Sequence, residues 1–281
     1  MTTPRRLRVL TALLFYVAGG ATILRAQPPG AYLGHLTWPE AEARLQEAPL
    51  VIVPFGAGAK EHGPHLPMNA DQVVMEYLVQ QAIDSLPVLA APSIVHGWFP
   101  AFRDFPGTEV SDPTVFADYV FEIVRSLIAH GARRIVILNM GIRNATGIPL
   151  AATAREIRVQ TGVPVLLVSW DDLETTEVET FQEQRIGGHA DEIETSIHLL
   201  LQPDLVHMDR AVVDYSSRVE RDYPGYEPGL YSRDPLDPAF STTGLTGDPT
   251  LATVEKGRRT LEIMTREWLK ALRGFAAASG Q

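Results

Sequence analysis

The segment from Gly58 to Asp71 carries side chains that suit metal chemistry. It holds His62, His65 and Asp71 in a loop rich in Gly and Pro, and the apolar run Leu50–Pro54 precedes it. A buried strand over that run would place the loop at the strand's carboxyl end, where ligands bind in open α/β sheets. Imidazole and carboxylate groups together suit a divalent ion such as Zn, Mn or Fe. The alternative is that the histidines brace the loop, because two His three residues apart form a weak pattern by themselves.

Short apolar runs alternate along the chain with longer amphipathic ones. The segments expected to form strands are rich in Val, Ile and Leu, as in a parallel sheet covered on both faces: Leu50–Pro54, Val88–Ala91, Arg134–Asn139 and Val163–Ser169. The segments expected to form helices are Ala70–Ser85, Thr114–His130, Ile148–Gln160, Glu192–Leu201 and Val254–Phe275. This alternation predicts a doubly wound α/β domain. Residues 213–250 break the pattern, and we expect them to be an ordered excursion over the surface or into a partner subunit.

Polar side chains follow each of the four expected strands. If the strands are parallel, the loops after them meet at one rim of the sheet, which favours a shared site. The candidates beyond the first loop are His96 and Trp98 after the second strand, Arg143 and Asn144 after the third, and His189, Glu192 and Glu194 after the fourth.

These motifs together resemble those of the creatininase family of amidohydrolases. The matching segments are Glu-His-Gly-Pro-His-Leu-Pro at 61–67 with Asp71 nine residues after His62, Phe-Pro-Gly-Thr at 105–108, Gly-Gly-His-Ala-x-Glu-x-Glu-Thr-Ser at 187–196, and Gly-Asp-Pro at 247–249 followed by Glu-Lys-Gly at 255–257. The resemblance implies a three-layer α/β/α domain, often a hexamer. It also implies a two-metal site that activates water to cleave a cyclic or linear amide.

The chain departs from the family pattern at several positions that bind metal. Lys60 stands where the family has a ligand glutamate, and Gly141 stands where it has a ligand histidine. Arg143 replaces a glutamate that binds the second metal in creatininases proper, and Ala101-Phe102 replaces a Glu-His pair. With these ligands lost, we expect one divalent ion per subunit or none.

The remaining ligands define the expected site. One ion would be held by His62 and Asp71 with a nearby glutamate, for which Glu61, Glu192 and Glu194 are the candidates. His189 and Glu194 are the expected proton carriers. Glu192 and Glu194 lie two apart on one helix, so they do not share a face.

Lys60 is expected to point into the pocket and to pair with Asp71 or Glu194, because a lysine would offset the charge that a lost metal once offset. The alternative is that Glu61 takes over ligation and Lys60 turns to solvent. The other pocket candidates are His65, Trp98, Arg143, Asn144 and Glu192. Several of the candidates have a structural alternative. His65 could brace its loop, Trp98 could belong to the core, and Arg143 could pair with a surface acid. Asp71 could cap a helix.

The amino terminus has the order of a secretory signal. Arg5, Arg6 and Arg8 precede the apolar run from Val9 to Leu24, and Ala26 offers a small residue at the cut. We therefore expect a signal peptide over residues 1–26, a single domain over 27–281, export to the periplasm or the extracellular space, and no stable membrane span after cleavage. An uncleaved anchor is the alternative.

Composition narrows the partners. The formal charge is −10, and removal of the four arginines of residues 1–26 makes it −14. An acidic chain of this kind argues against nucleic acid as a partner. There is no cysteine, so stability must come from the core or from a homo-oligomer.

The family resemblance and the departures from it leave two hypotheses. The first is a metal-dependent hydrolase of a C–N bond in a small amide. The second is a non-catalytic family member that binds a small ligand or a partner in the former metal pocket.

Overall fold

The four expected strands lie in one parallel sheet. The computed structural model describes residues 29–47, 50–141, 145–215, 231–237 and 240–278. Its strands are β1 (Ala31–Tyr32), β2 (Leu50–Phe55), β3 (Val88–Ala90), β4 (Ile135–Asn139) and β5 (Val165–Ser169). Their order is β1-β3-β2-β4-β5, and every pairing is parallel. β1 was not among the expected strands, and its two residues, Ala31 and Tyr32, pair with β3.

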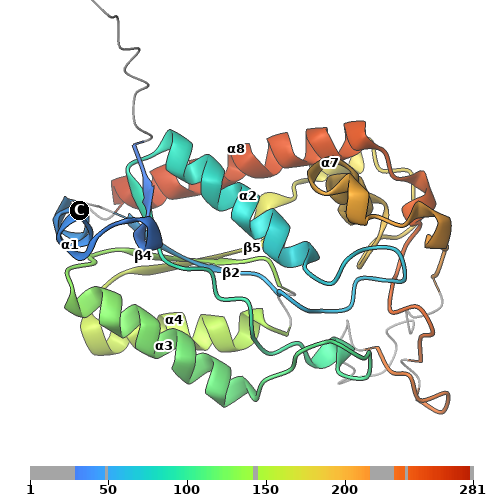
Figure 1. Cartoon of the computed structure of the whole chain (residues 1–281), viewed down its shortest axis with the longest axis horizontal. Helices are drawn as coiled ribbons and strands as arrows, with labels where there is room; N and C mark the ends of the chain where they lie inside the picture. Colours follow the sequence, from blue (N-terminus) through green and yellow to red (C-terminus); the bar gives the residue numbers. More distant parts are fainter. Residues whose placement is uncertain (1–28, 48–49, 142–144, 216–230, 238–239, 279–281) are drawn as a thin grey trace, which may run out of the picture.

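Helices cover both faces of the sheet, so the expected three-layer α/β/α architecture is confirmed (Figure 1). α2, α7 and α8 lie on one face, and α3 and α4 lie on the other. The helices are α1 (Trp38–Glu47), α2 (Ala70–Ser85), α3 (Pro113–Ala129), α4 (Gly147–Thr161), α5 (Trp170–Leu173), α6 (Thr176–Glu179), α7 (Glu192–Leu201) and α8 (Val254–Ala278). Asp112 caps the start of α3, since its side chain accepts hydrogen bonds from the backbone N–H groups of Thr114 and Val115.

β2, β3 and β4 are buried along their whole length and are mostly apolar, because central strands of a parallel sheet bury side chains on both faces. In β2, Leu50 and Ile52 belong to the core beneath α2 and α8, whereas Val51, Val53 and Phe55 belong to the core above α3 and α4. This alternation follows from the two-residue period of a strand.

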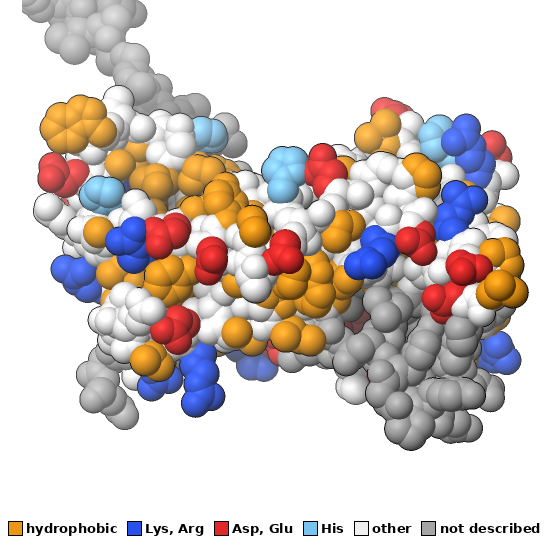
Figure 2. Space-filling model, turned by 90° about the horizontal axis from the view of Figure 1, so that it is seen from below, with side chains coloured by type: hydrophobic (Ala, Val, Ile, Leu, Met, Phe, Trp, Pro, Cys, Tyr) orange, Lys and Arg blue, Asp and Glu red, His pale blue; other side chains and the backbone are white. Residues whose placement is uncertain are grey.

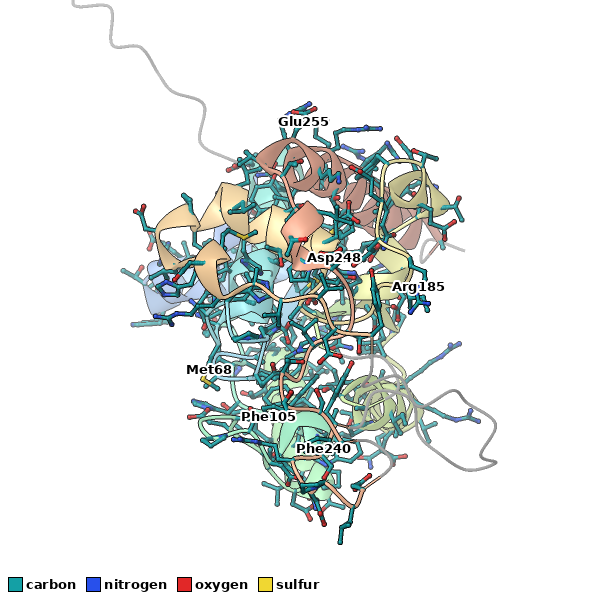
Figure 3. The ribbon with its side chains drawn as sticks, turned by 90° about the vertical axis from the view of Figure 1, so that its right-hand side faces the viewer. Met68, Phe105, Arg185, Phe240, Asp248 and Glu255 are labelled. Carbon is teal, nitrogen blue, oxygen red and sulfur yellow. The ribbon has the colours of Figure 1, made fainter. Side chains whose placement is uncertain are left out.

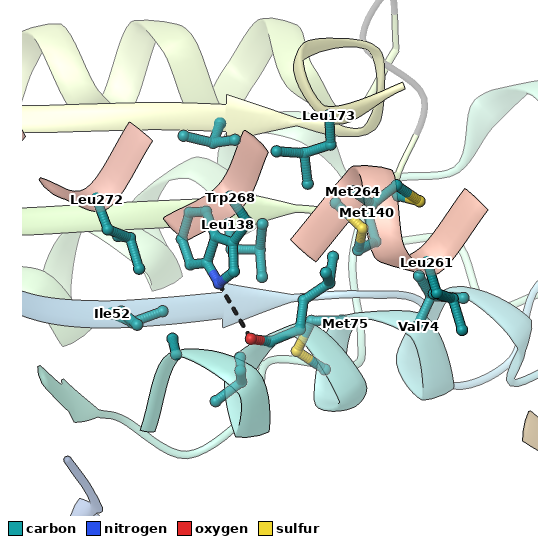
Figure 4. Close-up of a cluster of buried hydrophobic side chains, with 14 of the residues drawn as sticks. Ile52, Val74, Met75, Leu138, Met140, Leu173, Leu261, Met264, Trp268 and Leu272 are labelled. Carbon is teal, nitrogen blue, oxygen red and sulfur yellow. Dashed lines mark hydrogen bonds between the residues drawn. The ribbon is translucent and has the colours of Figure 1, made fainter. Parts of the chain in front are cut away.

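The core between the sheet and α8 is organised around Trp268 (Figure 4). Its indole is fully buried and donates a hydrogen bond to the Leu78 carbonyl of α2 at 3.0 Å. The bond satisfies the indole N–H, which would otherwise be costly to bury. It also ties the carboxy-terminal helix to the helix that starts at the candidate site.

The chain reverses its direction across the sheet between β2 and β4. From β2 it passes to β3 on one side, and β4 then pairs on the other side of β2. In doubly wound sheets the crevice at this switch point, outside the carboxyl ends of the strands, is where ligands bind. The loop that contains His62 leaves the carboxyl end of β2 at this point.

The described residues of the 213–250 excursion pair with one another and with the rest of the domain. One short bridge joins Asp214 to Gly247 within the excursion, and another joins Thr246 to His189 outside it.

The face of the molecule formed by α3 and α4, across the sheet from α2, α7 and α8, presents mixed hydrophobic and charged side chains (Figure 2). In the described part of the chain, no helix combines the length and the apolar character that crossing a membrane requires.

Candidate active site at the carboxyl end of the sheet

Lys60, His62 and Asp71 form a buried polar group between β2 and α2. Asp71 lies in the first turn of α2, where its carboxylate is 2.8 Å from the Lys60 ammonium, and both side chains are 3% exposed. The expected Lys60–Asp71 pair is therefore confirmed, and Lys60 does not turn to solvent. His62 directs Nδ1 to the Lys60 carbonyl and Nε2 to the Asp71 carboxylate, each at 2.9 Å.

His189 is held between two glutamates. Its backbone pairs with Thr246 in a short antiparallel bridge, which fixes the residue next to α7. Its Nε2 lies 2.9 Å from the Glu61 carbonyl and 3.1 Å from the Glu61 carboxylate, and its Nδ1 lies 3.7 Å from the Glu194 carboxylate. Glu194 also accepts a hydrogen bond from the Ala190 N–H.

The two histidines meet, and with Glu194 they form the group best placed to hold a metal. One ligand atom from each of His62, His189 and Glu194 lies within 4.8 Å of the others. Two members of this set, His62 and Glu194, were among the expected ligands, whereas His189 takes the place expected for Asp71. Asp71 and Glu61 lie next to this group. Asp71 pairs with Lys60 and His62, and Glu61 contacts His189.

The charges of the group are strongly coupled. Burial alone would raise the pKa of Asp71, but Lys60 and His62 hold it well below its usual range. Burial disfavours the charged form of His189, yet Glu61 and Glu194 raise the pKa of this histidine above its usual value. Burial would raise the pKa of Glu194, and His189, His62 and Lys60 lower it. Both carboxylates are therefore ionised at neutral pH.

An aromatic wall closes one side of the group. The Phe102 ring lies 4.3 Å from the His189 ring and 5.0 Å from Tyr231, centroid to centroid, and the Lys60 ammonium lies 5.4 Å from its centroid. Tyr231 is joined to Thr246 by a 3.0 Å hydrogen bond between their hydroxyl groups. Phe102 is fully buried, so water is excluded from this side of His189.

The other expected pocket residues lie elsewhere or outside the described residues. His65 braces its loop against α7, with Nε2 2.8 Å from the Thr195 hydroxyl, and burial lowers its pKa to about 4. Trp98 is half-buried and packs against the core on the α3 side. Glu192 is fully buried, but it contacts Lys256 rather than the histidines. Arg143 and Asn144 lie outside the described residues.

Some residues around the group carry no motif that would have revealed them. Tyr231 lies in the stretch that breaks the β/α pattern, and it meets Phe102 only through the fold. Gly244 lies so close to the Glu61 carboxylate that a Cβ at this position would be 2.3 Å from it. Glu174, which accepts a hydrogen bond from the Trp170 indole, has its pKa raised to about 7 by burial.

Several segments that are separate in the sequence meet at the end of the molecule that faces the viewer in Figure 3. The labelled residues mark them: Met68 from the loop after β2, Phe105 from the loop after β3, Arg185 from the segment before α7, and Asp248 from the segment before α8. Of the four loops expected at one rim, three meet in the described residues: those after β2 and β3 and the segment before α7, through the contacts of His189 with Glu61 and Phe102. Residues 142–144 of the loop after β4 lie outside the described residues.

The donor set fits one divalent ion. Carbonyl oxygens can only accept, so His62 donates Nδ1–H to the Lys60 carbonyl and His189 donates Nε2–H to the Glu61 carbonyl. Histidines that bind metal are oriented by such bonds from the ring nitrogen that does not bind the metal. The other nitrogen of each ring faces a carboxylate, and a cation, either a proton or a metal ion, belongs between them. Beside Asp71 the Lys60 ammonium already supplies a positive charge.

These features define a class of protein: a doubly wound α/β domain with a buried histidine–carboxylate site at the switch point of its sheet. The family model described as creatinine amidohydrolase matches residues 34–272. The chain belongs to the creatininase family.

Curated relatives agree with this assignment. The creatinine amidohydrolase of Pseudomonas putida is 31% identical over 261 residues, which is 86% of this chain and 96% of the relative. The 3-dehydro-scyllo-inosose hydrolase of Thermotoga maritima is 26% identical, over 85% of this chain and 81% of the relative. The mycofactocin precursor peptide peptidase of Mycolicibacterium smegmatis is 26% identical, over 75% and 79%.

Solved creatininase structures share the fold. A manganese form of creatininase superposes with a TM-score of 0.73 at 28% identity, covering 87% of this chain and 98% of that one. A creatininase mutant in a Zn-Zn form gives a TM-score of 0.72 at 28% identity, with 86% and 97% covered.

Proposed function

We propose that this protein hydrolyses an amide C–N bond of a small molecule with the help of one divalent ion of the Zn, Mn or Fe class. The observation that carries the proposal is the orientation of His62 and His189: each gives one N–H to a backbone carbonyl and turns its other nitrogen to a carboxylate. The names of relatives, a creatinine amidohydrolase and a peptide peptidase among them, support hydrolysis of an amide.

The charges support one ion rather than two. Glu61, Asp71 and Glu194 bring three carboxylates into the group, and Lys60 supplies one fixed positive charge. Buried charges must be paired, so an excess of two negative charges calls for one dication when both histidines are neutral. The creatininase structures that match include a manganese form and a Zn-Zn form, which supports a metal of this kind.

Each residue has a part in the proposed reaction. His62, His189 and Glu194 would hold the ion, which when bound would act as a Lewis acid on the amide carbonyl. Glu61 and the Lys60 carbonyl fix the two rings, and Lys60 neutralises Asp71 so that it does not compete for a second ion. Glu194 is the most exposed of the three ligands, at 19%, so the substrate reaches the site on its side. One oxygen of Glu194 would hold the ion, and we assign its other oxygen the proton of the water that attacks the carbonyl carbon. Glu194 would pass this proton to the nitrogen that leaves when the C–N bond breaks.

The test combines metal content with turnover. Elemental analysis of the purified protein should give one equivalent of metal, and the loaded protein should cleave at least one member of a panel that contains creatinine and linear amides. His62→Ala should lose at least 100-fold in metal affinity, in line with the loss of one of three ligands. The matched control is His96→Ala, because His96 also contacts a carboxylate, that of Glu109, but is 74% exposed.

Two results would overturn the proposal. Two tightly bound equivalents would show that Lys60 does not exclude the second ion. Cleavage at an unchanged rate by the metal-free protein would show that the ion has no part in the reaction.

A second candidate is a non-catalytic protein that binds a small ligand in the same pocket. The observation that favours it is the Lys60–Asp71 pair, which stands where the family pattern has ligand carboxylates. Absence of both metal and turnover, together with saturable binding of a member of the amide panel, would support this candidate.

A further inference from the structure

A second buried ionic group lies on the far side of α7 from the histidines. Lys256, in the first turn of α8, contacts the carboxylate of Glu192, the carboxylate of Glu183 at 2.6 Å and the carbonyl of Leu251 at 2.9 Å. The Glu192 side chain is completely buried, whereas the Glu183 side chain is 65% exposed. Lys256 therefore provides the cation that a buried glutamate requires.

Glu192 also fixes the segment that leads to His189. Its carboxylate accepts hydrogen bonds from the backbone N–H of Glu183 at 2.9 Å and from that of Gln184 at 2.6 Å. These donors precede His189 by only a few residues. One carboxylate thus ties together the start of α7, the start of α8 and the segment that carries a proposed metal ligand.

The geometry of a helix connects this group to the candidate site. Residues two positions apart on an α-helix point in directions about 200° apart, so a helix that turns Glu192 toward Lys256 turns Glu194 to the opposite side. Glu194 there contacts His189 and the Ala190 N–H. The rotation of α7 that satisfies Glu192 is the rotation that aims Glu194 at His189.

We propose that Lys256 is a positioning residue: through Glu192 it sets the rotation of α7 and the place of the 183–191 segment, and so holds Glu194 against His189. The consequence for metal binding rests on the function proposed above, whereas the consequence for the His189–Glu194 contact does not. A simple structural role is the competing explanation, since a buried ion pair is often replaceable by apolar side chains without loss of stability.

The experiment separates these roles with two variants and a control. Lys256→Met leaves Glu192 buried and unpaired, whereas Lys256→Met with Glu192→Met leaves no buried charge in this pair. Lys270→Met is the matched control, because Lys270 lies on the same helix and pairs with Glu267 at the surface. Urea unfolding measures stability, calorimetry with Zn²⁺ measures metal affinity, and crystal structures measure the distance from His189 Nδ1 to the Glu194 carboxylate, which is 3.7 Å in the native chain.

We expect the double variant to be more stable than Lys256→Met, yet to bind Zn²⁺ at least tenfold more weakly than the native protein, as for other losses of support around metal ligands. We expect the His189–Glu194 distance to increase by about 1 Å or more, a displacement large enough to matter in a site. Lys270→Met should match the native protein in all three measurements. If Lys256→Met does not fold, the double variant alone carries the test.

A double variant with native Zn²⁺ affinity and an unchanged His189–Glu194 distance would overturn the proposal. If the native protein binds no Zn²⁺, the proposed function fails, but the crystal structures still decide the positioning role. An unchanged distance would then refute it, and a displaced Glu194 would support it.

Discussion

Lys60 takes the place of a ligand carboxylate and changes what the pocket can hold. Its ammonium lies 2.8 Å from Asp71, inside a group whose side chains are almost wholly buried. A lysine ammonium is a compact charge with three donors, so it can neutralise Asp71 but supplies no open coordination position. Lys60 and Gly141 stand where the family resemblance implies a ligand glutamate and a ligand histidine. The charge of Asp71 is still balanced without those ligands, because Lys60 neutralises it.

The Lys60→Met variant tests this balance. It removes the cation and keeps most of the apolar stem, so Asp71 stays buried without its strongest partner. Breaking a buried pair in this way costs about 3–5 kcal/mol, and urea unfolding at pH 7 should show a loss of that order. Lys270→Met, at an exposed position, should lose less than about 1 kcal/mol.

The pH dependence of this loss has a definite sign. In the native protein the pKa of Asp71 lies below its usual value of 3.8, so its contribution to stability is present above that pH and is lost as the pH falls through the folded-state pKa. In Lys60→Met the His62 contact remains, but we expect burial, the largest effect on Asp71, to prevail and to raise its pKa above 3.8. The stability deficit of the variant relative to the native protein should then shrink as the pH is lowered from 7 toward 4. A deficit that stays constant over this range would show that Asp71 is not the source.

The sequence predicts which residues reach the rim, but not which atoms meet there. The Lys60–Asp71 pair could be predicted, because both residues lie in the 58–71 segment and Asp71 lies at the expected start of the helix Ala70–Ser85. The contact of His189 with the Glu61 carbonyl joins residues 128 positions apart, and the Thr246 bridge comes from a stretch without a motif. A role as metal ligand for His189 depends on these long-range contacts, so the sequence alone favoured proton transfer.

At the scale of elements, the close packing of α7 against α8 depends on Gly257. A Cβ at this position would lie 2.0 Å from the Ser196 carbonyl oxygen, so Gly257→Ala must push the two helices apart. We expect a loss of about 1–3 kcal/mol in the free energy of unfolding, the usual cost of overpacking. Because α7 carries Glu194, metal affinity should fall in the same variant.

Gly274 is the matched control on the same helix. No heavy atom lies within 4 Å of the place where its Cβ would stand. Gly274→Ala should therefore raise stability by up to about 1 kcal/mol through helix propensity alone. Thermal unfolding of both variants checks the pair, and a neutral Gly257→Ala would contradict the tight packing of α7 on α8.

Elements with strong local signals were predicted closely, and weak ones were not. α2 and α7 begin and end at the predicted residues because their flanking signals are clear. α1 was missed because, among its residues, only Leu45 is buried, so its apolar pattern is faint. β1 has only two residues, and its place in the sheet depends on the pairing with β3 rather than on any run of its own.

For the whole molecule, the prediction of export rests on the order of basic, apolar and small residues at the amino terminus. Residues 1–26 lie outside the described residues, and they hold four arginines and no acid, while the whole chain carries a formal charge of −10. The described contacts include some close to the expected cut: Gly30 donates a hydrogen bond to the Ile83 carbonyl, and β1 starts at Ala31. Cleavage near Ala26 would therefore remove none of the described contacts.

We propose that the chain is exported and cut near Ala26, and mass spectrometry of the periplasmic or extracellular fraction should show a protein that lacks the first 26 residues. Leu14→Arg places a charge in the middle of the apolar run, which a signal sequence does not tolerate, so export should drop at least tenfold. Thr3→Arg adds the same charge to the basic region and should leave export unchanged. Full-length protein found only in the cytosol, for the native chain as well as for Leu14→Arg, would refute export. The formal charge of the functional protein would then be −10, because it would keep the four arginines of residues 1–26.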